Sequence, residues 1–394
     1  MEKTKNNLDI SFTFLFLCFI IIEITYTKKG LSMVKRNTNI ELLRVIASLI
    51  IPVYHWLLYN GIFYAQNSSN SILSLTLFSG IQIMSLYAFI ATSSYFLIQK
   101  KYNWKANKLF SFITLVVLLY VFKTVVVNQL FPGYYMNEYV NSFFLKGSWW
   151  YVYPYLLLMA FYPLLNYIIY KLPIVLLYGI TTILVIMFTI PGLMNTTNFF
   201  SNCIAFLSIY FTMGCLQRND YSIMKHKHAR IILCIAIILG ILIMTSFCLY
   251  FKLFANTLSV EEANACIQKV HCRYNIIGLI GGIFIFLIFK NTDVPYNATI
   301  NHFAKYSLYI FLIHETVMSV FWYFYIKSAE FLAYLPAIQF WGYIIIYELF
   351  CIITAYLIDK IYSIVFKPLF DKLIIKLCET TFIKGLENHT IGRK

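Results

Sequence analysis

The sequence predicts an all-α protein, a bundle of about ten helices that cross a membrane. Of its residues, 60% are hydrophobic and only 12% are charged, whereas soluble domains average about 25% charged residues. Apolar runs of membrane-spanning length follow one another along the chain and are separated by short connections. No run of alternating strand pattern and no long polar domain interrupts them. We therefore expect one polytopic membrane domain over residues 33–366.

Ten apolar runs are long enough to cross a bilayer, which takes about 20 consecutive apolar residues in a helix. They cover residues 40–63, 71–98, 109–131, 149–170, 172–191, 199–216, 229–252, 274–289, 305–327 and 338–366.

Basic residues gather in alternate connections between these runs. The connection 99–108 holds four lysines, whereas 64–70 and 192–198 hold no charge. Basic loops stay in the cytoplasm, so we expect both ends of the ten-span unit there, in a multi-pass protein of the cell membrane. The same clustering accounts for the net charge of +15 without a nucleic-acid partner.

The two ends of the chain differ from the ten-span unit. Residues 1–32 hold an apolar run that includes Glu23 and is followed by Lys28 and Lys29. Three interpretations are open: a signal-type segment, an eleventh span, or residues upstream of a native start at Met33. The tail 367–394 mixes apolar residues with lysines, which predicts a partly amphipathic helix on the cytoplasmic surface.

Arg44 and His55 form the most informative pair of polar residues. They lie eleven residues apart on one apolar helix, which is three turns plus roughly 20°, so their side chains share a face about 16 Å apart along the axis. Ionisable groups within a span usually face the bundle interior and serve a function. Glu41 lies one turn before Arg44 and is suited to neutralise its charge. The alternative to a functional role is that the Arg44 side chain extends to the lipid head groups.

His55 has the chemistry of a general base near neutral pH, the alternative being a structural hydrogen bond in the bundle. No Gly-x-Ser-x-Gly or His-Glu-x-x-His motif occurs, and no metal is expected. Direct attack by a substrate hydroxyl is therefore favoured over a serine acyl-enzyme.

Further polar residues extend the candidate site. Within the spans lie Lys123, His314 with Glu315, Glu348 and Asp359. Lys105 and Lys108 belong to the basic loop, which either sets topology or also holds a phosphate-bearing donor. Trp150 and Tyr153 begin the fourth run and form either an interfacial aromatic belt or a stacking platform for a sugar ring.

Four segments resemble the acyltransferase-3 family of integral-membrane acyltransferases. NIELLRVIASLIIPVYHW carries the family's Arg-x10-His pattern at Arg44 and His55, and FAKYSLYIFLIHE resembles the late-span stretch that ends at His314. IATSSYFLIQKKYNWKANKLF is similar to the end of the second span and the basic loop, and SWWYVYPYLLLMAFYPLLN resembles the Trp-Tyr start and Tyr-x-x-Pro-x-x-Asn end of a further span. Ser94 replaces a usual glycine, and Lys105 and Lys108 replace an Arg-x-x-Arg pair. Lysine attracts phosphate but lacks the planar fork of arginine.

The resemblance implies an O-acyltransferase of a bacterial plasma membrane, in particular an O-acetyltransferase of a cell-surface glycan. The donor it implies is acetyl-CoA, bound by Lys105, Lys108 and Arg44, with His55 and Arg44 in the catalytic centre. His314, Glu315, Trp150 and Tyr153 are then expected to bind the glycan or lipid-linked saccharide acceptor. A carrier or flippase for lipid-linked sugars is the alternative, because it too would bury a few charges among its spans.

Overall fold

The computed structural model describes residues 37–102, 104–130, 150–194, 199–254, 258–325 and 330–380. The expectations for residues 1–32 concern a part of the chain outside these ranges.

Helices coincide with all ten predicted spans, which confirms the all-α bundle. Eight spans among the described residues are long and apolar enough to cross a membrane. The helices that match the ten runs are α2 (Thr38–Tyr59), α3 (Ser69–Phe78) with α4 (Ile81–Gln99), α5 (Ala106–Leu130), α7 (Val152–Lys171), α8 (Ile174–Met194), α9 (Phe199–Arg218), α10 (Ala229–Leu253), α12 (Ile276–Lys290), α14 (Ser307–Tyr325) and α15 (Ala337–Ile361).

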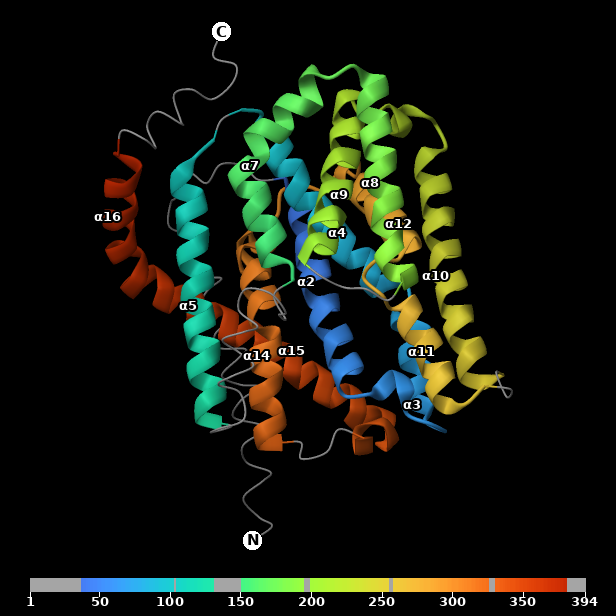
Figure 1. Ribbon diagram of the computed structural model, residues 1–394. Helices are drawn as coiled ribbons and strands as arrows, with labels where there is room; N and C mark the ends of the chain where they lie inside the picture. The colour runs from blue at the N-terminus through green and yellow to red at the C-terminus, as the bar shows by residue number, and fades with distance from the viewer. Residues whose placement is uncertain are drawn as a thin grey trace.

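Helix α2 lies in the middle of the bundle, where it packs against α4, α12, α14 and α15 (Figure 1). Its apolar side chains Leu43, Ile51 and Leu57 are all at most 3% exposed. A central helix must be apolar on most of its surface, so its polar side chains meet other protein groups rather than lipid.

Helices α4 and α12 pack closely because α12 offers glycines to α4. A Cβ added at Gly282 would lie 2.7 Å from the Met84 carbonyl oxygen, and one at Gly281 would lie 2.5 Å from Met84 Sδ. Small residues let membrane helices approach until their backbones touch, and these glycines therefore set the distance between α4 and α12.

The connection between α10 and α12 differs from the expected outer loop. Its residues Val260–Val270 form an amphipathic helix, α11, which starts in a capping box of Ser259 and Glu262 and packs back against α10. The 15 residues of α12 span only about 22 Å, less than the roughly 30 Å of a bilayer core. Figure 1 shows α11 below α12, so the two helices form one crossing in two pieces.

A buried amide caps the end of α4 that carries the basic loop. Asn166 of α7 donates hydrogen bonds to the carbonyl oxygens of Leu97 at 3.1 Å and Lys101 at 2.6 Å, and accepts one from Tyr210 at 2.8 Å. The last carbonyls of a helix need such partners. Asn166, at the end of the stretch Tyr162-Pro-x-x-Asn, therefore fixes the end of α4 from which the basic loop starts.

The tail continues α15 through a π-turn at Tyr362–Phe366 into α16 (Lys367–Cys378), which packs beside α5. Leu369 and Leu373 on α16 are more than half exposed. The predicted amphipathic helix is present; its place on the membrane surface stays a prediction.

Candidate active site

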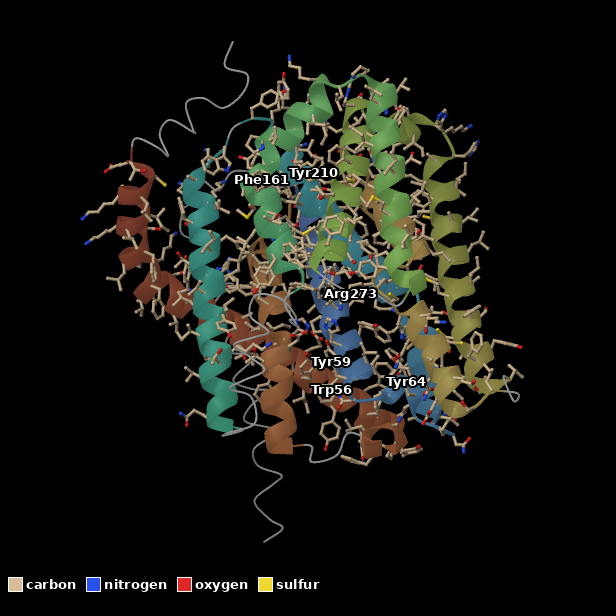
Figure 2. All side chains as sticks on the ribbon, in the orientation of Figure 1. Trp56, Tyr59, Tyr64, Phe161, Tyr210 and Arg273 are labelled. Atoms are coloured by element: carbon tan, nitrogen blue, oxygen red, sulfur yellow. The ribbon has the colours of Figure 1, made fainter. Side chains whose placement is uncertain are left out.

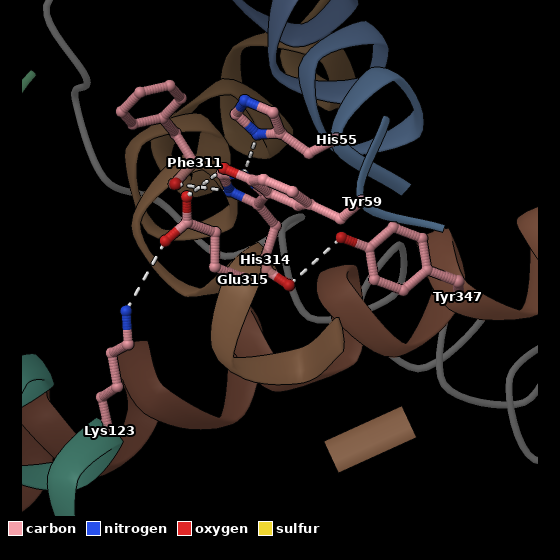
Figure 3. Close-up of polar contacts among 7 residues, drawn as sticks. All are labelled: His55, Tyr59, Lys123, Phe311, His314, Glu315 and Tyr347. Carbon is pink, nitrogen blue, oxygen red and sulfur yellow. Dashed lines mark hydrogen bonds and ion pairs between the residues drawn. The ribbon is translucent and has the colours of Figure 1, made fainter. Parts of the chain in front are cut away.

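Two histidines from distant parts of the chain meet inside the bundle. His55 Nδ1 on α2 lies 2.6 Å from His314 Nε2 on α14, and their rings stack at 4.8 Å between centroids and 8° between planes (Figure 3). His314 is 3% exposed. The Tyr347 hydroxyl donates to its backbone oxygen at 3.1 Å and anchors α14 on α15.

The hydrogen bonds of this pair determine where its protons lie. His314 Nδ1 is 2.6 Å from the backbone oxygen of Phe311, and a carbonyl oxygen only accepts. Nδ1 of a neutral His314 therefore carries the proton, and its Nε2 accepts from His55 Nδ1–H. Nε2 of His55 is then left with a lone pair, which is the form a general base requires.

A carboxylate and a buried lysine lie beside the histidine pair. Glu315 follows His314 on α14, and its carboxylate lies 3.5 Å from Lys123 Nζ of α5. The Tyr59 hydroxyl, one turn beyond His55, donates to the other Glu315 oxygen at 3.4 Å. Tyr59 also stacks on His55, with 5.3 Å between ring centroids. Helices α2, α5 and α14 thus contribute adjacent polar groups, as Figure 3 shows.

His55, His314 and Glu315 also carry the kinds of atoms that bind a metal ion. Ligand atoms of His55, His314 and Glu315 lie within 4.8 Å of one another. Two imidazole nitrogens bound to one Zn²⁺ at about 2.1 Å stand roughly 3.3 Å apart in a tetrahedral site. The observed 2.6 Å between the ring nitrogens therefore matches a shared proton better than a shared metal ion.

Arg44 lies on the same helix as His55 but has different partners. Its guanidinium pairs with Glu41 at 2.9 Å, as the spacing predicted. The structure thus confirms the ion pair and leaves the binding and catalytic roles of Arg44 as predictions.

The lysines of the basic loop gather at the end of α4. Lys105 and Lys108 are exposed, and Lys100, which we did not single out from the sequence, lies half-buried with its ammonium 5.6 Å from the ring centre of Tyr162. Burial, and then the charges of Lys108 and Lys105, lower the pKa of Lys100 to about 8. Such a cluster is suited to a phosphate-bearing ligand.

The aromatic residues at the start of α7 differ in burial, and Tyr151 lies inside the bundle. Tyr151 is 1% exposed and its ring contacts Phe311, with centroids 4.8 Å apart. The guanidinium of Arg273 lies 4.9 Å from the ring centre of Trp150. The Arg273 cation therefore covers one face of the Trp150 ring, for which stacking on a sugar ring was one of the two interpretations of the sequence. Tyr153 is half-buried on α7, and its role in acceptor binding stays a prediction.

Arg273 is an interior residue that the sequence did not single out. It lies between α11 and α12, and Figure 2 shows it in the middle of the bundle, above Tyr59 and Trp56 in that view. The Tyr54 hydroxyl, beside His55 on α2, donates to the backbone oxygen of His271 at 3.4 Å, two residues before Arg273. A signal was present, since Arg273 directly precedes 274–289, which is the shortest of the ten apolar runs.

A family model described as "Acyltransferase domain", that of the acyltransferase-3 family, matches residues 37–360. Comparison with curated proteins and with solved structures gives no match. The matched residues contain the whole described bundle up to the last turn of α15. The chain therefore belongs to the acyltransferase-3 family and is a multi-pass membrane acyltransferase.

Proposed function

We propose that this protein is an O-acyltransferase that moves an acyl group, in particular acetyl, from acyl-CoA to a hydroxyl of a cell-surface glycan. One observation carries the proposal: the hydrogen-bonded chain from Phe311 through His314 to His55. It orients His55 and leaves Nε2 as an acceptor, as a third group does for the base of a catalytic triad.

The reaction that fits this geometry is direct attack of the acceptor on the thioester. The acceptor hydroxyl donates a hydrogen bond to His55 Nε2, and its oxygen attacks the carbonyl carbon while the proton passes to Nε2. The carbonyl electron pair moves onto oxygen and then returns, which breaks the C–S bond and releases the CoA thiolate. The thiolate takes the proton from His55, and the bond from Nδ1–H to His314 stabilises the imidazolium in between.

The donor's phosphates are assigned to the basic end of the bundle. The half-buried Lys100 follows the last turn of α4, Lys105 directly precedes α5, and Lys108 lies in the first turn of α5. Acetyl-CoA is polyanionic, and ammonium groups bind phosphate by charge. Arg44 lies on α2 between this end and His55, in a position to orient the pantetheine arm.

The acceptor is assigned to the opposite side of His55. Tyr59 and Glu315 lie there in contact with each other, and hydroxyl and carboxylate groups are suited to hydrogen-bond a saccharide. Because His314 is committed to His55 and Phe311 through its two ring nitrogens, we assign it the task of orienting the base. We also propose that Trp150 and Tyr153 help to bind the acceptor.

The test is acyl transfer by the protein purified in lipid nanodiscs. With acetyl-labelled acetyl-CoA and the surface glycan or its lipid-linked precursor, we expect label to appear on the glycan as an alkali-labile ester. His55→Ala is the matched inactive control. A carrier or flippase would instead move the saccharide across a vesicle membrane without consuming acetyl-CoA, and that result would contradict the proposal.

Acetyl-CoA binding is expected to weaken as the pH rises through about 8. The pKa of Lys100 is lowered to about 8 by burial and by the neighbouring Lys108 and Lys105. Only the protonated form of Lys100 attracts phosphate, so its contribution to acetyl-CoA affinity is complete below that pH and is lost above it. For one proton, the affinity falls by at most about tenfold per pH unit.

Calorimetric titration with acetyl-CoA on either side of this pH measures the effect. Lys100→Arg should keep its affinity at the higher pH, because a guanidinium stays charged. Lys101→Arg, at an exposed neighbouring position, should behave like the wild type. Equal losses in the wild type and Lys100→Arg would exclude Lys100 as the titrating group.

A further inference from the structure

The crossing formed by α11 and α12 is interrupted inside the bundle. Residues 271–275 join the two helices without regular structure apart from turns. His271, at the start of this break, is 6% exposed, and Tyr274 is 3% exposed. Non-helical backbone at membrane depth is tolerated where protein covers it or where it lines a polar cavity, and broken helices commonly mark substrate sites.

Hydrogen bonds on both sides of Arg273 hold this break in place. Asn275 accepts from the backbone N–H groups of Ile277 at 2.9 Å and Gly278 at 3.2 Å, so it caps α12. The Tyr274 hydroxyl donates to Asn202 of α9 at 2.8 Å. The backbone of Arg273 is thereby fixed relative to α9 and α12, as preorganised charge stabilisation requires.

The guanidinium of Arg273 lies among groups of the proposed reaction centre. It sits 4.9 Å from the ring centre of Trp150, a cation–π distance that holds its plane. Tyr54, whose ring centre lies 5.5 Å from that of the adjacent His55 on α2, donates a hydrogen bond to the backbone oxygen of His271 at 3.4 Å. The break that carries Arg273 therefore lies against the turn of α2 that carries His55, and Figure 2 shows Arg273 above Tyr59 in that view.

The other interior cations described next already have ion-pair or hydrogen-bond partners. Arg44 pairs with Glu41 and Lys123 with Glu315. Arg218 donates to the backbone oxygens of Ile169 and Leu172. In the part of the chain that the structure describes, no carboxylate forms an ion pair with Arg273. A half-buried guanidinium held over a ring in this way is ready to receive an anion.

We propose that Arg273 stabilises the negative charge that develops on the thioester carbonyl oxygen when the acceptor attacks. The guanidinium N–H groups donate to this oxygen as the carbonyl electron pair moves onto it, while His55 holds the acceptor's proton. The proposal rests on the proposed function. It assigns the electrostatic part of the reaction to a residue outside the four segments of family resemblance, and it leaves Arg44 to the donor.

The test compares Arg273→Gln, Arg273→Lys and Lys269→Gln in nanodiscs, with two reactions measured for each: acetyl transfer to the glycan and hydrolysis of acetyl-CoA without acceptor. Water attack creates the same oxyanion. We expect Arg273→Gln to lower kcat of both reactions by about 10²–10³ with KM values little changed. Arg273→Lys should recover part of the loss, and Lys269→Gln, which removes an exposed charge from α11, should match the wild type.

Three results would overturn this assignment. The first is Arg273→Gln with an unchanged kcat. The second is a raised acceptor KM with normal hydrolysis, which would mean that Arg273 binds an anionic group of the acceptor. The third is loss of acetyl-CoA binding and of thermal stability that Arg273→Lys does not restore, which would mean a structural role. If the wild type itself neither transfers nor hydrolyses the acyl group, the proposed function fails as well.

Discussion

Replacing His55 by alanine is expected to lower acyl transfer by about 10²–10⁴-fold, the usual contribution of a general base. The change removes Nε2, the nitrogen left with a lone pair by the hydrogen bond between His55 and His314. Transfer of labelled acetyl to the glycan measures the effect, and unchanged binding of acetyl-CoA shows that the donor site is intact.

Matched histidine variants make this result specific. His226→Ala removes an exposed histidine at the basic end and should have no effect. His314→Gln can still accept a hydrogen bond from His55 Nδ1–H, so it should keep more activity than His314→Phe, which cannot. Full transfer by His55→Ala would remove this residue from the mechanism, and equal activity of the two His314 variants would refute the orienting role.

Gly282→Ala is expected to be the most disruptive single-methyl change in the bundle interior. The added Cβ would lie 2.7 Å from Met84 O and 2.8 Å from Ala88 N, and these are backbone atoms of α4 that no side-chain rotation can move. Helix α12 must then shift away from α4 and carry the adjoining break at Arg273 with it. Overpacking of this kind costs about 1–3 kcal/mol, so both thermal stability and kcat should fall.

Gly179→Ala is the matched control for that prediction. A Cβ at Gly179, on α8, meets no atom within 4 Å, and alanine favours helix over glycine by up to about 1 kcal/mol. Its melting temperature should be unchanged or higher. If Gly282→Ala matched Gly179→Ala in stability and activity, the close contact between α4 and α12 would not set the position of the site.

Much of the fold follows from local sequence. Span positions depend on runs of apolar residues, and each of the ten predicted runs coincides with a helix. The ion pair of Glu41 with Arg44 depends on i,i+3 spacing within one helix, and it is present. The break at 271–275 was missed because hydropathy locates α12 but does not show that the amphipathic α11 packs back against α10.

The candidate site was only partly predictable for the same reason. His55 and His314 were both identified, but their 2.6 Å contact joins residues 259 positions apart. The aromatic start of α7 matches an interfacial belt in composition, yet Tyr151 there is buried against Phe311. Lys100 differs from Lys105 only in its burial beside Tyr162, which sequence alone does not reveal.

The sequence by itself determined that this chain is a membrane-crossing helical bundle, which faces of its helices carry charge, and which family it resembles, because each of these depends on residues within a few turns of one another. Only the tertiary structure decided that His314 contacts His55, that Glu315 meets Lys123 and Tyr59, and that Arg273 lies over the ring of Trp150 at a broken crossing. These contacts depend on which helices are neighbours. That is settled by close packing of side chains and glycines across the whole bundle, and no local pattern encodes it.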